Sequence, residues 1–260
     1  MREVEKLVEN ADVYESAIET VDLAKTYKEG KIKAVDKLNL KIKKGEIYAL
    51  IGANGSGKTT TINMITGCLF PTSGSITVLE HKIPEKRRLV AAQIGVAPQE
   101  YALYSDLSVE QNIRFFARLY SMKQSVFDNR LDELLPILRL TEKRKTAVSN
   151  LSGGMKRRVS IACALVHEPK IVFFDEATVG IDPVLRAFFW DYFRDLALAG
   201  LTIVITSHVM DEAERADRIG LMRAGKLIEE GTPAEIKGRH GTSSIEEVFI
   251  KLSSGEIVDE

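Results

Sequence analysis

Residues 51–64 read IGANGSGKTTTINM, and this stretch predicts a phosphate-binding loop between a strand and a helix. It contains the pattern G-x-x-x-x-G-K-[ST] from Gly52 to Thr59, after the strand-like run EIYALI. Glycines let successive backbone N–H groups converge on phosphate oxygens, which a Cβ would obstruct. The start of the following helix adds its positive dipole end. The stretch therefore indicates a nucleoside triphosphate site; the alternative is a glycine-rich turn without a ligand.

Two side chains of this loop have specific expected roles. Lys58 would reach the β- and γ-phosphates, and the Thr59 hydroxyl would be a ligand of Mg²⁺. The other loop residues that we expect to contact the nucleotide are Gly52, Asn54, Gly55, Ser56, Gly57 and Thr60.

A pair of acids follows a second apolar run, KIVFFDE at residues 170–176. The four apolar residues predict a buried strand with Asp175 at its carboxyl end, where open α/β sheets bind their ligands. Asp175 would hold the Mg²⁺ shell, and Glu176 is placed to polarise an attacking water. Two adjacent acids alone would more often be a solvated strand end, but a phosphate loop in the same chain favours the catalytic interpretation.

A second glycine stretch, NLSGGMKRRVSIACALV at residues 150–166, also precedes a helical pattern. Ser152 can cap the helix that begins near Met155, and Gly153 and Gly154 leave its first N–H groups open to an anion. Taken alone, such a sequence is more often a plain helix start than a ligand site.

The order of the other patterns predicts an α/β core interrupted by a helical insert. Strand-like segments dominate residues 17–52, and strands are also expected at residues 74–80 and 89–97. Residues 108–120 and 128–140 read as helices, the first with Ser108 and Gln111 in capping-box spacing and the second bent or restarted at Pro136. Helices and apolar strands then alternate, with helices at 155–167, 184–199 and 209–216, which favours a parallel sheet covered on both faces.

Composition excludes several classes of protein. The formal net charge of −1 implies no bulk attraction to nucleic acid, and the apolar runs are too short to span a bilayer. The charged start MREVEKLVEN is unlike a secretory signal, so we expect a cytosolic protein. Cys68 and Cys163 are too few for a disulfide framework, and we expect both to be buried thiols.

The motif LSGGM, after a phosphate loop and before FFDEAT, resembles the signature of ATP-binding-cassette (ABC) ATPases. The resemblance covers about residues 17–230. It implies the ABC ATPase fold, a P-loop NTPase parallel-sheet core with an antiparallel β subdomain and an inserted α-helical subdomain. It also implies ATP and Mg²⁺ as ligands and ATP hydrolysis as the activity.

Four further residues match motifs of this family. Tyr27 looks like its adenine-stacking aromatic residue, although it could be an ordinary strand-face tyrosine. Gln99 in VAPQE matches the glutamine that reaches Mg²⁺ and water, and Asp182 in VGIDP resembles the loop that crosses to the partner subunit, although a simple turn into a helix is the alternative. His208 in ITSH matches the switch histidine that contacts the γ-phosphate. The resemblance therefore implies Glu176, His208 and Gln99 as the catalytic group.

The chain departs from the family at three positions: Met155 replaces the usual Gln, Ala177 the common Pro and Ile181 the usual Leu. The sequence GGM followed by basic residues, and SIEEVFIKL near the end, resemble the drug- and polysaccharide-export branch (ABC-2 type). This resemblance implies a subunit of an exporter-type transporter, so export is the expected direction of transport.

The resemblance implies two kinds of protein partner. A second cassette chain, identical or different, would place its Ser152–Gly154 segment on the ATP bound at the first chain's Gly52–Thr59 loop. An integral membrane permease would hold this subunit at the cytoplasmic face, and no nucleic acid is expected. The rival functions are a soluble ABC ATPase of repair, translation or cluster assembly, and a regulatory module without turnover. The predicted divisions are an N-terminal extension 1–16, a nucleotide-binding core 17–97 and 160–235, a helical subdomain 98–159 and a C-terminal tail 236–260.

Overall fold

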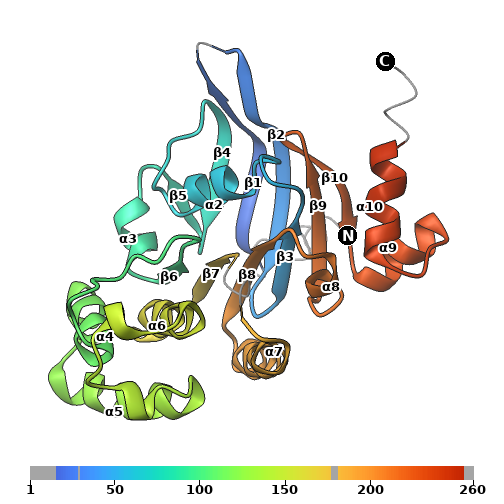
Figure 1. Ribbon diagram of the computed structural model, residues 1–260. Helices are drawn as coiled ribbons and strands as arrows, with labels where there is room; N and C mark the ends of the chain where they lie inside the picture. The colour runs from blue at the N-terminus through green and yellow to red at the C-terminus, as the bar shows by residue number, and fades with distance from the viewer. Residues whose placement is uncertain (1–15, 29, 177–180, 255–260) are drawn as a thin grey trace, which may run out of the picture.

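The computed structural model describes residues 16–28, 30–176 and 181–254. Two β-sheets and a group of helices make up these residues, with the antiparallel sheet and the helices α4 to α7 on opposite sides of the larger sheet (Figure 1). Residues 1–15 of the expected N-terminal extension lie outside the described residues, and residue 16 begins the strand β1 (Ser16–Tyr27).

The larger sheet has six strands in the order β10-β9-β3-β8-β7-β6. Five of them run parallel, and β10 joins the edge antiparallel to β9. The strands are β3 (Ile47–Ile51), β6 (Ile94–Ala97), β7 (Ile171–Asp175), β8 (Thr202–Ser207), β9 (Arg218–Arg223) and β10 (Lys226–Gly231). All residues of β3, β7 and β8 are buried, which confirms the prediction of a parallel sheet covered on both faces.

Alternate residues of the central strands enter two different hydrophobic cores. Ile47, Ala49 and Ile51 pack with residues of the helices, whereas Tyr48 and Leu50 pack with the antiparallel sheet and α2 (Lys58–Ile65). This division follows from the two-residue side-chain period of a strand. The second sheet has the order β2-β1-β4-β5 and contains β1 (Ser16–Tyr27), β2 (Ile32–Lys43), β4 (Ser73–Val78) and β5 (His81–Ile83).

Helical structure fills the chain between β6 and β7. Its elements are α4 (Val109–Leu119), α5 (Gln124–Ile137), the short 3₁₀ helices η1 (Thr141–Lys143) and η2 (Val148–Asn150), and α6 (Gly153–Leu165). Ser108 and Gln111 form the predicted capping box at the start of α4. The helix α5 includes Pro136 and ends one residue later, so the proline stands in its last turn and no second helix restarts there.

Two other predictions were wrong in part. The strand expected at residues 89–97 is a short helix, α3 (Arg87–Ala91), followed by the strand β6, because only the second half of the segment pairs with β7. Cys163 is buried in α6, where burial raises the pKa of its thiol, but Cys68 is exposed in the turn after α2. In this turn the next residue, Leu69, packs against the core, whereas the Cys68 side chain faces solvent.

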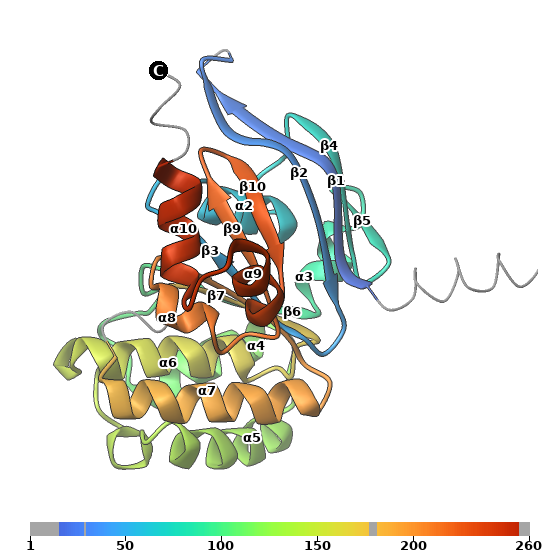
Figure 2. The same ribbon diagram turned by 90° about the vertical axis from the view of Figure 1, so that its right-hand side faces the viewer.

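The last part of the chain packs against the core. Its helices are α7 (Pro183–Leu198), α8 (Met210–Ala213), α9 (Pro233–His240) and α10 (Ile245–Ser254), and the helix predicted at 209–216 is thus a single turn. Ile236, Ile245 and Val248 are fully buried in the same core as α4 to α7, and α9 and α10 lie beside β10 (Figure 2). Within the described ranges, no helix has both the length and the apolar character that a bilayer span requires.

Candidate functional site

The loop from Gly52 to Gly57 leads from the buried strand β3 into the first turn of α2. Its conformation depends on glycine at two positions. A Cβ on Gly52 would lie 2.2 Å from the Met222 carbonyl oxygen, and one on Gly57 would lie 2.3 Å from the Ala34 carbonyl oxygen. Gly57 also has φ of +108°, which L side chains rarely adopt. The predicted loop between strand and helix is therefore present, and its tight approach to β2 and β9 explains the glycines.

Lys58 begins α2 and folds back over this loop. Its side chain is only 5% exposed, and Nζ donates to the carbonyl oxygens of Gly52 (2.7 Å) and Ala53 (3.1 Å). Burial lowers the pKa of Lys58, while the charges of Glu176 and Asp175 oppose that shift. The ammonium group thus stands at the loop, with two acids close enough to affect its titration.

Ser56 supplies a separate observation about the loop. Its hydroxyl is buried and has no hydrogen-bond partner among the described residues. A buried hydroxyl without a partner costs free energy unless a ligand or water completes it. The loop therefore has an unsatisfied polar group in addition to its glycines, as expected of a site that binds a polar ligand.

Asp175 ends the strand β7 and is buried beside the phosphate loop. The Thr59 hydroxyl donates to its Oδ1 at 3.4 Å, and the Thr206 hydroxyl donates to the same oxygen. Thr206 was not among the residues predicted from the sequence. The register of the parallel pair β7 and β8 places Asp175 opposite Thr206, so the positions of the strand ends could have indicated it.

Three predicted residues meet at one carboxylate. Gln99 Nε2 donates to Glu176 Oε2 at 3.0 Å, and His208 Nδ1 lies 3.3 Å from Glu176 Oε1. The backbone N–H of Glu176 is held by the carbonyl and hydroxyl oxygens of Thr206, at 3.0 and 3.2 Å. Glu176 also has φ of +52°, a left-handed conformation that is costly for a residue with a side chain. The surroundings therefore hold the Glu176 backbone in a strained conformation and fix the position of its carboxylate.

A hollow of about 530 Å³ joins the loop to these residues. Tyr27, at the end of β1, lines it with a ring that is 40% exposed. Ile32 and Ala34 of β2 also line it and were not predicted, although the hairpin pairing of Tyr27 with Ile32 could have indicated the first. The complete lining is Tyr27, Ile32, Ala34, Asn54, Gly55, Gly57, Lys58, Thr59, Thr60, Gln99 and Glu176.

The second glycine stretch does not line this hollow. Ser152 is the N-cap of α6 and accepts a hydrogen bond from the Met155 N–H at 3.3 Å, as the sequence predicted. Ser152 and Gly153 are exposed, and Gly154 is half-buried. The helix α6 is anchored by buried residues such as Val159 and presents its first turn to solvent.

Asp182 also caps a helix. Its Oδ1 accepts a hydrogen bond from the Leu185 N–H at 3.0 Å, and Pro183 occupies the first position of α7. This local role agrees with the simple-turn interpretation of the segment and leaves the partner-subunit role a prediction. Ala177, one of the departures from the family pattern, lies outside the described residues.

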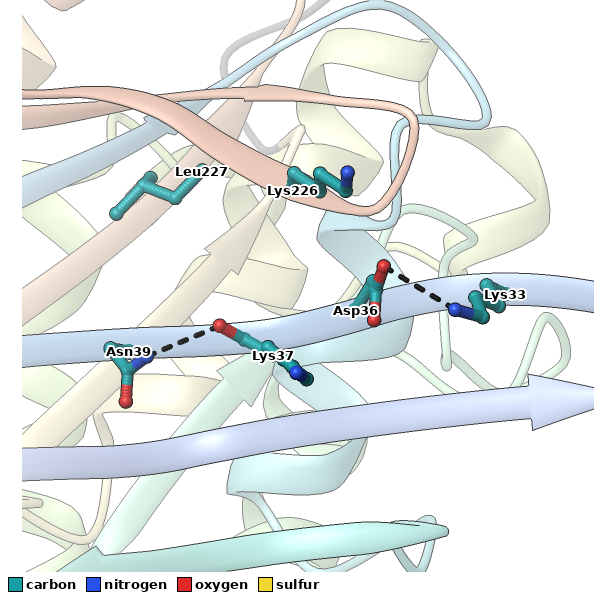
Figure 3. Close-up of a pocket in the computed structure, with 6 residues that line it drawn as sticks. All are labelled: Lys33, Asp36, Lys37, Asn39, Lys226 and Leu227. Atoms are coloured by element: carbon teal, nitrogen blue, oxygen red, sulfur yellow. Dashed lines mark hydrogen bonds and ion pairs between the residues drawn. The ribbon is translucent and has the colours of Figure 1, made fainter.

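A second hollow, of about 490 Å³, lies between β2 and the β9–β10 hairpin and contains none of the predicted site residues (Figure 3). Lys33 pairs with Asp36 at 3.7 Å, and the Asn39 amide donates to the Lys37 carbonyl at 3.2 Å. Its lining contains no group placed to activate water beside a phosphate-binding loop. The first hollow is therefore the candidate functional site.

A glycine loop after β3, a buried aspartate at the end of β7 and a glutamate held by glutamine and histidine define the class of ATP-binding cassettes. The chain belongs to the ABC transporter family: the sequence profile described as "ABC transporter" matches residues 35–179. Within the family, the chain is 38% identical over 243 residues to the "Probable multidrug ABC transporter ATP-binding protein YbhF" of Escherichia coli. This match covers 92% of the chain but 42% of the relative, so the chain spans less than half of that protein.

The chain covers a larger share of two other relatives. The chain is 38% identical to the "Linearmycin resistance ATP-binding protein LnrL" of Bacillus subtilis, a match that covers 88% of the chain and 73% of LnrL. It is 40% identical to the "Nod factor export ATP-binding protein I" of Rhizobium meliloti, a match that covers 84% of the chain and 64% of the relative.

Solved structures confirm the predicted fold class. An "ATP binding subunit of ABC transporter" superposes with a TM-score of 0.84 at 28% identity, and the match covers 92% of the chain and all of that structure. A dimeric ATP-binding cassette bound to ADP and Pi gives a TM-score of 0.77 at 27% identity, and the match covers 83% of the chain and 98% of that structure.

Proposed function

We propose that this chain binds and hydrolyses ATP in the hollow between Tyr27 and Glu176, as the ATP-binding subunit of an exporter. The observation that carries the proposal is the joint placement of Gln99 and His208 on the Glu176 carboxylate, beside the phosphate loop. The triphosphate would lie on the backbone N–H groups of residues 54–59, with Lys58 turning from the loop carbonyls to phosphate oxygens. The base would stack on the exposed ring of Tyr27.

The oxygen atoms near the loop fit Mg²⁺. Thr59 Oγ1 and Asp175 Oδ1 are 3.4 Å apart, and Gln99 adds an amide oxygen from the adjacent loop. Hydroxyl, carboxylate and carbonyl oxygens are the ligands that Mg²⁺ prefers, and it usually takes only one or two protein carboxylates beside substrate phosphates. When bound, the ion would neutralise charge on the β- and γ-phosphates.

Glu176 would accept a proton from the attacking water. Its carboxylate is nearly buried, while the contacts to Gln99 and His208 fix the orientation of its two oxygens. A base held in this way contributes to hydrolysis only if the water lies within hydrogen-bond reach of it. Gln99 and His208 would therefore position both the base and the γ-phosphate end of the nucleotide.

A second cassette chain would complete the site. The first turn of α6 is exposed and does not line the hollow of its own chain, although its open N–H groups suit an anion. A head-to-tail pair would bring Ser152, Gly153 and Gly154 of one chain to the nucleotide of the other. A structural relative of this chain is a dimeric cassette bound to ADP and Pi, which supports this arrangement.

A membrane-spanning partner would supply the transport path. The relatives carry names of multidrug, linearmycin-resistance and Nod factor export proteins, which support an exporter over a soluble repair or translation ATPase. In that role the subunit would lie at the cytoplasmic face of the membrane, held there by its permease.

The substitution Glu176→Gln tests the base and the dimer together. It keeps the shape and the hydrogen bonds but removes the carboxylate, so hydrolysis should fall by about 10²–10⁴-fold. The ATP-bound dimer should then accumulate, because a ligand that binds only the closed dimer stabilises it by mass action. Light scattering with MgATP should show a lasting dimer, whereas the wild type returns to monomer as ATP is consumed.

The matched control is Glu142→Gln in η1, which removes the same charge from an exposed glutamate that does not line the hollow. It should leave hydrolysis unchanged. Hydrolysis by Glu176→Gln at the wild-type rate would show that the base lies elsewhere. An inactive Glu176→Gln that stays monomeric at high ATP would contradict the pairing of two copies of this chain.

A further inference from the structure

Arg157 lies one turn into α6 and reaches back to the loop that carries Gln99. Its guanidinium donates to the carbonyl oxygens of Pro98 at 2.7 Å and Gln99 at 2.9 Å. The residue is 5% exposed, and within the described ranges its Nε has no hydrogen-bond partner. The guanidinium group of arginine stays charged even when it is buried. The carbonyl oxygens of Pro98 and Gln99 are the polar partners that compensate for the burial of this charge.

Tyr101 joins the same loop to the start of α6 at a second point. Its ring lies under the Arg157 guanidinium, 5.0 Å from ring centre to Cζ. Its hydroxyl donates to the Gly153 carbonyl oxygen at 3.1 Å. The segment from Pro98 to Tyr101 therefore contacts α6 at two points: at Gly153, the first residue of the helix, and at Arg157, one turn later.

The loop is bound to the hydrolysis site at its other side. Gln99 Nε2 donates to Glu176 Oε2, so one residue has its backbone on α6 and its side chain on the proposed base. Burial lowers the pKa of Arg157, and the charges of Asp175 and Glu176 oppose this shift, which is consistent with its proximity to both acids. An unbroken series of contacts thus runs from Gly153 through Tyr101, Arg157 and Gln99 to Glu176.

We propose that Arg157 and Tyr101 are positioning residues that couple the exposed start of α6 to Glu176 within one chain. A nucleotide held by the partner chain would bind at Ser152–Gly154 and shift α6. The contacts of Tyr101 and Arg157 would transmit this shift to Gln99. The ATP bound by one chain would thereby orient Glu176 of the other chain, the base that acts on the other ATP. This inference rests on the proposed function, since it needs two chains that each present α6 to the other's nucleotide.

Tyr101→Phe is the sharpest test, because it removes only the hydroxyl and leaves the ring under the guanidinium. We expect ATP binding by dilute, monomeric protein to stay unchanged. The kcat for hydrolysis should fall by about 2- to 10-fold, the effect of one hydrogen bond, and the Hill coefficient for ATP should fall from above one towards one. In the Glu176→Gln background, Tyr101→Phe should still dimerise with ATP, since it leaves the α6 N–H groups intact.

Arg157→Lys keeps the charge but cannot hold two carbonyls with a planar fork. We expect a larger loss of kcat, about 10- to 100-fold as for hydrogen bonds to a charged group, with the same loss of cooperativity. The matched control is Arg158→Lys on the same helix. Arg158 donates to the carbonyls of Leu138 and Arg139, each at 3.2 Å, and to that of Gly154 at 3.3 Å, so it contacts the start of α6 as Tyr101 does but makes no such bond to the Gln99 loop. It should alter thermal stability but leave the Hill coefficient unchanged.

The outcomes separate the inference from the proposed function. A wild type that does not hydrolyse ATP overturns the function and the inference with it. A wild type that hydrolyses ATP with a Hill coefficient of one overturns only the coupling. A Tyr101→Phe variant with unchanged kcat, or with reduced kcat and full cooperativity, also overturns the coupling and leaves a structural contact. If Arg157→Lys does not fold, Tyr101→Phe decides alone.

Discussion

The two glycine stretches of this chain both precede a helix, but they differ in what surrounds them. At Gly52 and Gly57 the backbone approaches β2 and β9 so closely that a Cβ would overlap a carbonyl oxygen, and Lys58 folds onto the loop. At Gly153 the nearest atom to an added Cβ is the Tyr101 hydroxyl at 3.5 Å, an ordinary contact. The first stretch is shaped by its own chain, whereas the second is an exposed helix start.

Under the proposed function, this difference gives the two stretches different roles when two chains pair. The first loop already has its cation, its neighbouring acids and an adjacent hollow within one chain. The start of α6 has open N–H groups and no described residue of its own chain that supplies an anion to them. Under the proposed function, the first stretch would bind a nucleotide by itself, and the second would act only when a second chain brings one. The following substitutions test this division.

Lys58→Ala should have the largest effect on the first stretch. It removes the cation that would face the triphosphate. Each hydrogen bond from this cation to a charged phosphate oxygen would contribute about 1.5–3 kcal/mol to binding. We expect calorimetric titration to show MgATP affinity reduced by about 10²-fold or more. The fold should persist because loop residues 53–55 are exposed, so water can reach the Ala53 carbonyl that Lys58 leaves. Unchanged affinity would show that this loop does not hold the phosphates.

Gly154→Asp should affect the second stretch alone. A carboxylate at the start of α6 would repel the partner's γ-phosphate, and two such charges at about 4 Å interact by roughly 1–4 kcal/mol. We expect turnover to fall by about 10- to 100-fold, and the ATP affinity of the dilute chain to stay the same. Added to Glu176→Gln, the change should abolish the ATP-dependent dimer.

Gly238→Asp is the matched control for this charge, because Gly238 is an exposed helical glycine with no atom within 4 Å of an added Cβ. It should leave turnover unchanged. A loss of ATP affinity in monomeric Gly154→Asp would contradict the separation of the two stretches.

Tyr27→Ala should weaken nucleotide binding moderately. Stacking of a base on an aromatic ring contributes about 1–3 kcal/mol, and a ring face stacks on any base. Affinities for ATP and GTP should therefore fall together, and Tyr27→Phe, which keeps the ring, should bind as the wild type does. If Tyr27→Ala binds ATP with full affinity, Tyr27 is an ordinary exposed residue of β1.

Ser152→Ala should have the smallest effect. The Ser152 side chain caps α6, and loss of such a cap costs about 1 kcal/mol of stability. We expect a small decrease in the thermal midpoint, with ATP affinity of the monomer unchanged. Ser108→Ala removes an equivalent cap from α4 and should destabilise the protein by a similar amount without reducing turnover. Equal turnover in the two variants would show that the Ser152 hydroxyl serves only its own helix.

The sequence by itself determined the local structures that carry the site. The glycine pattern at Gly52–Thr59 specified a loop between strand and helix, and the apolar run before Asp175 specified a buried strand that ends at an acid. Ser152 and Asp182 could be identified as helix caps because a cap bonds to a backbone N–H only three residues away. Such features depend on neighbouring residues, so a single stretch contains the information.

Tertiary structure alone decided which of these elements meet. Gln99 and Glu176 are 77 residues apart in the chain, Asp175 and Thr206 are 31 apart, and Arg157 reaches a loop 58 residues earlier. The same holds for the exposure of Cys68 and for the division of residues 89–97 between α3 and β6, which the local pattern predicted wrongly. Strand order and packing set these contacts, because hydrogen bonds and burial form between whichever surfaces the sheet brings together, whatever their separation in sequence.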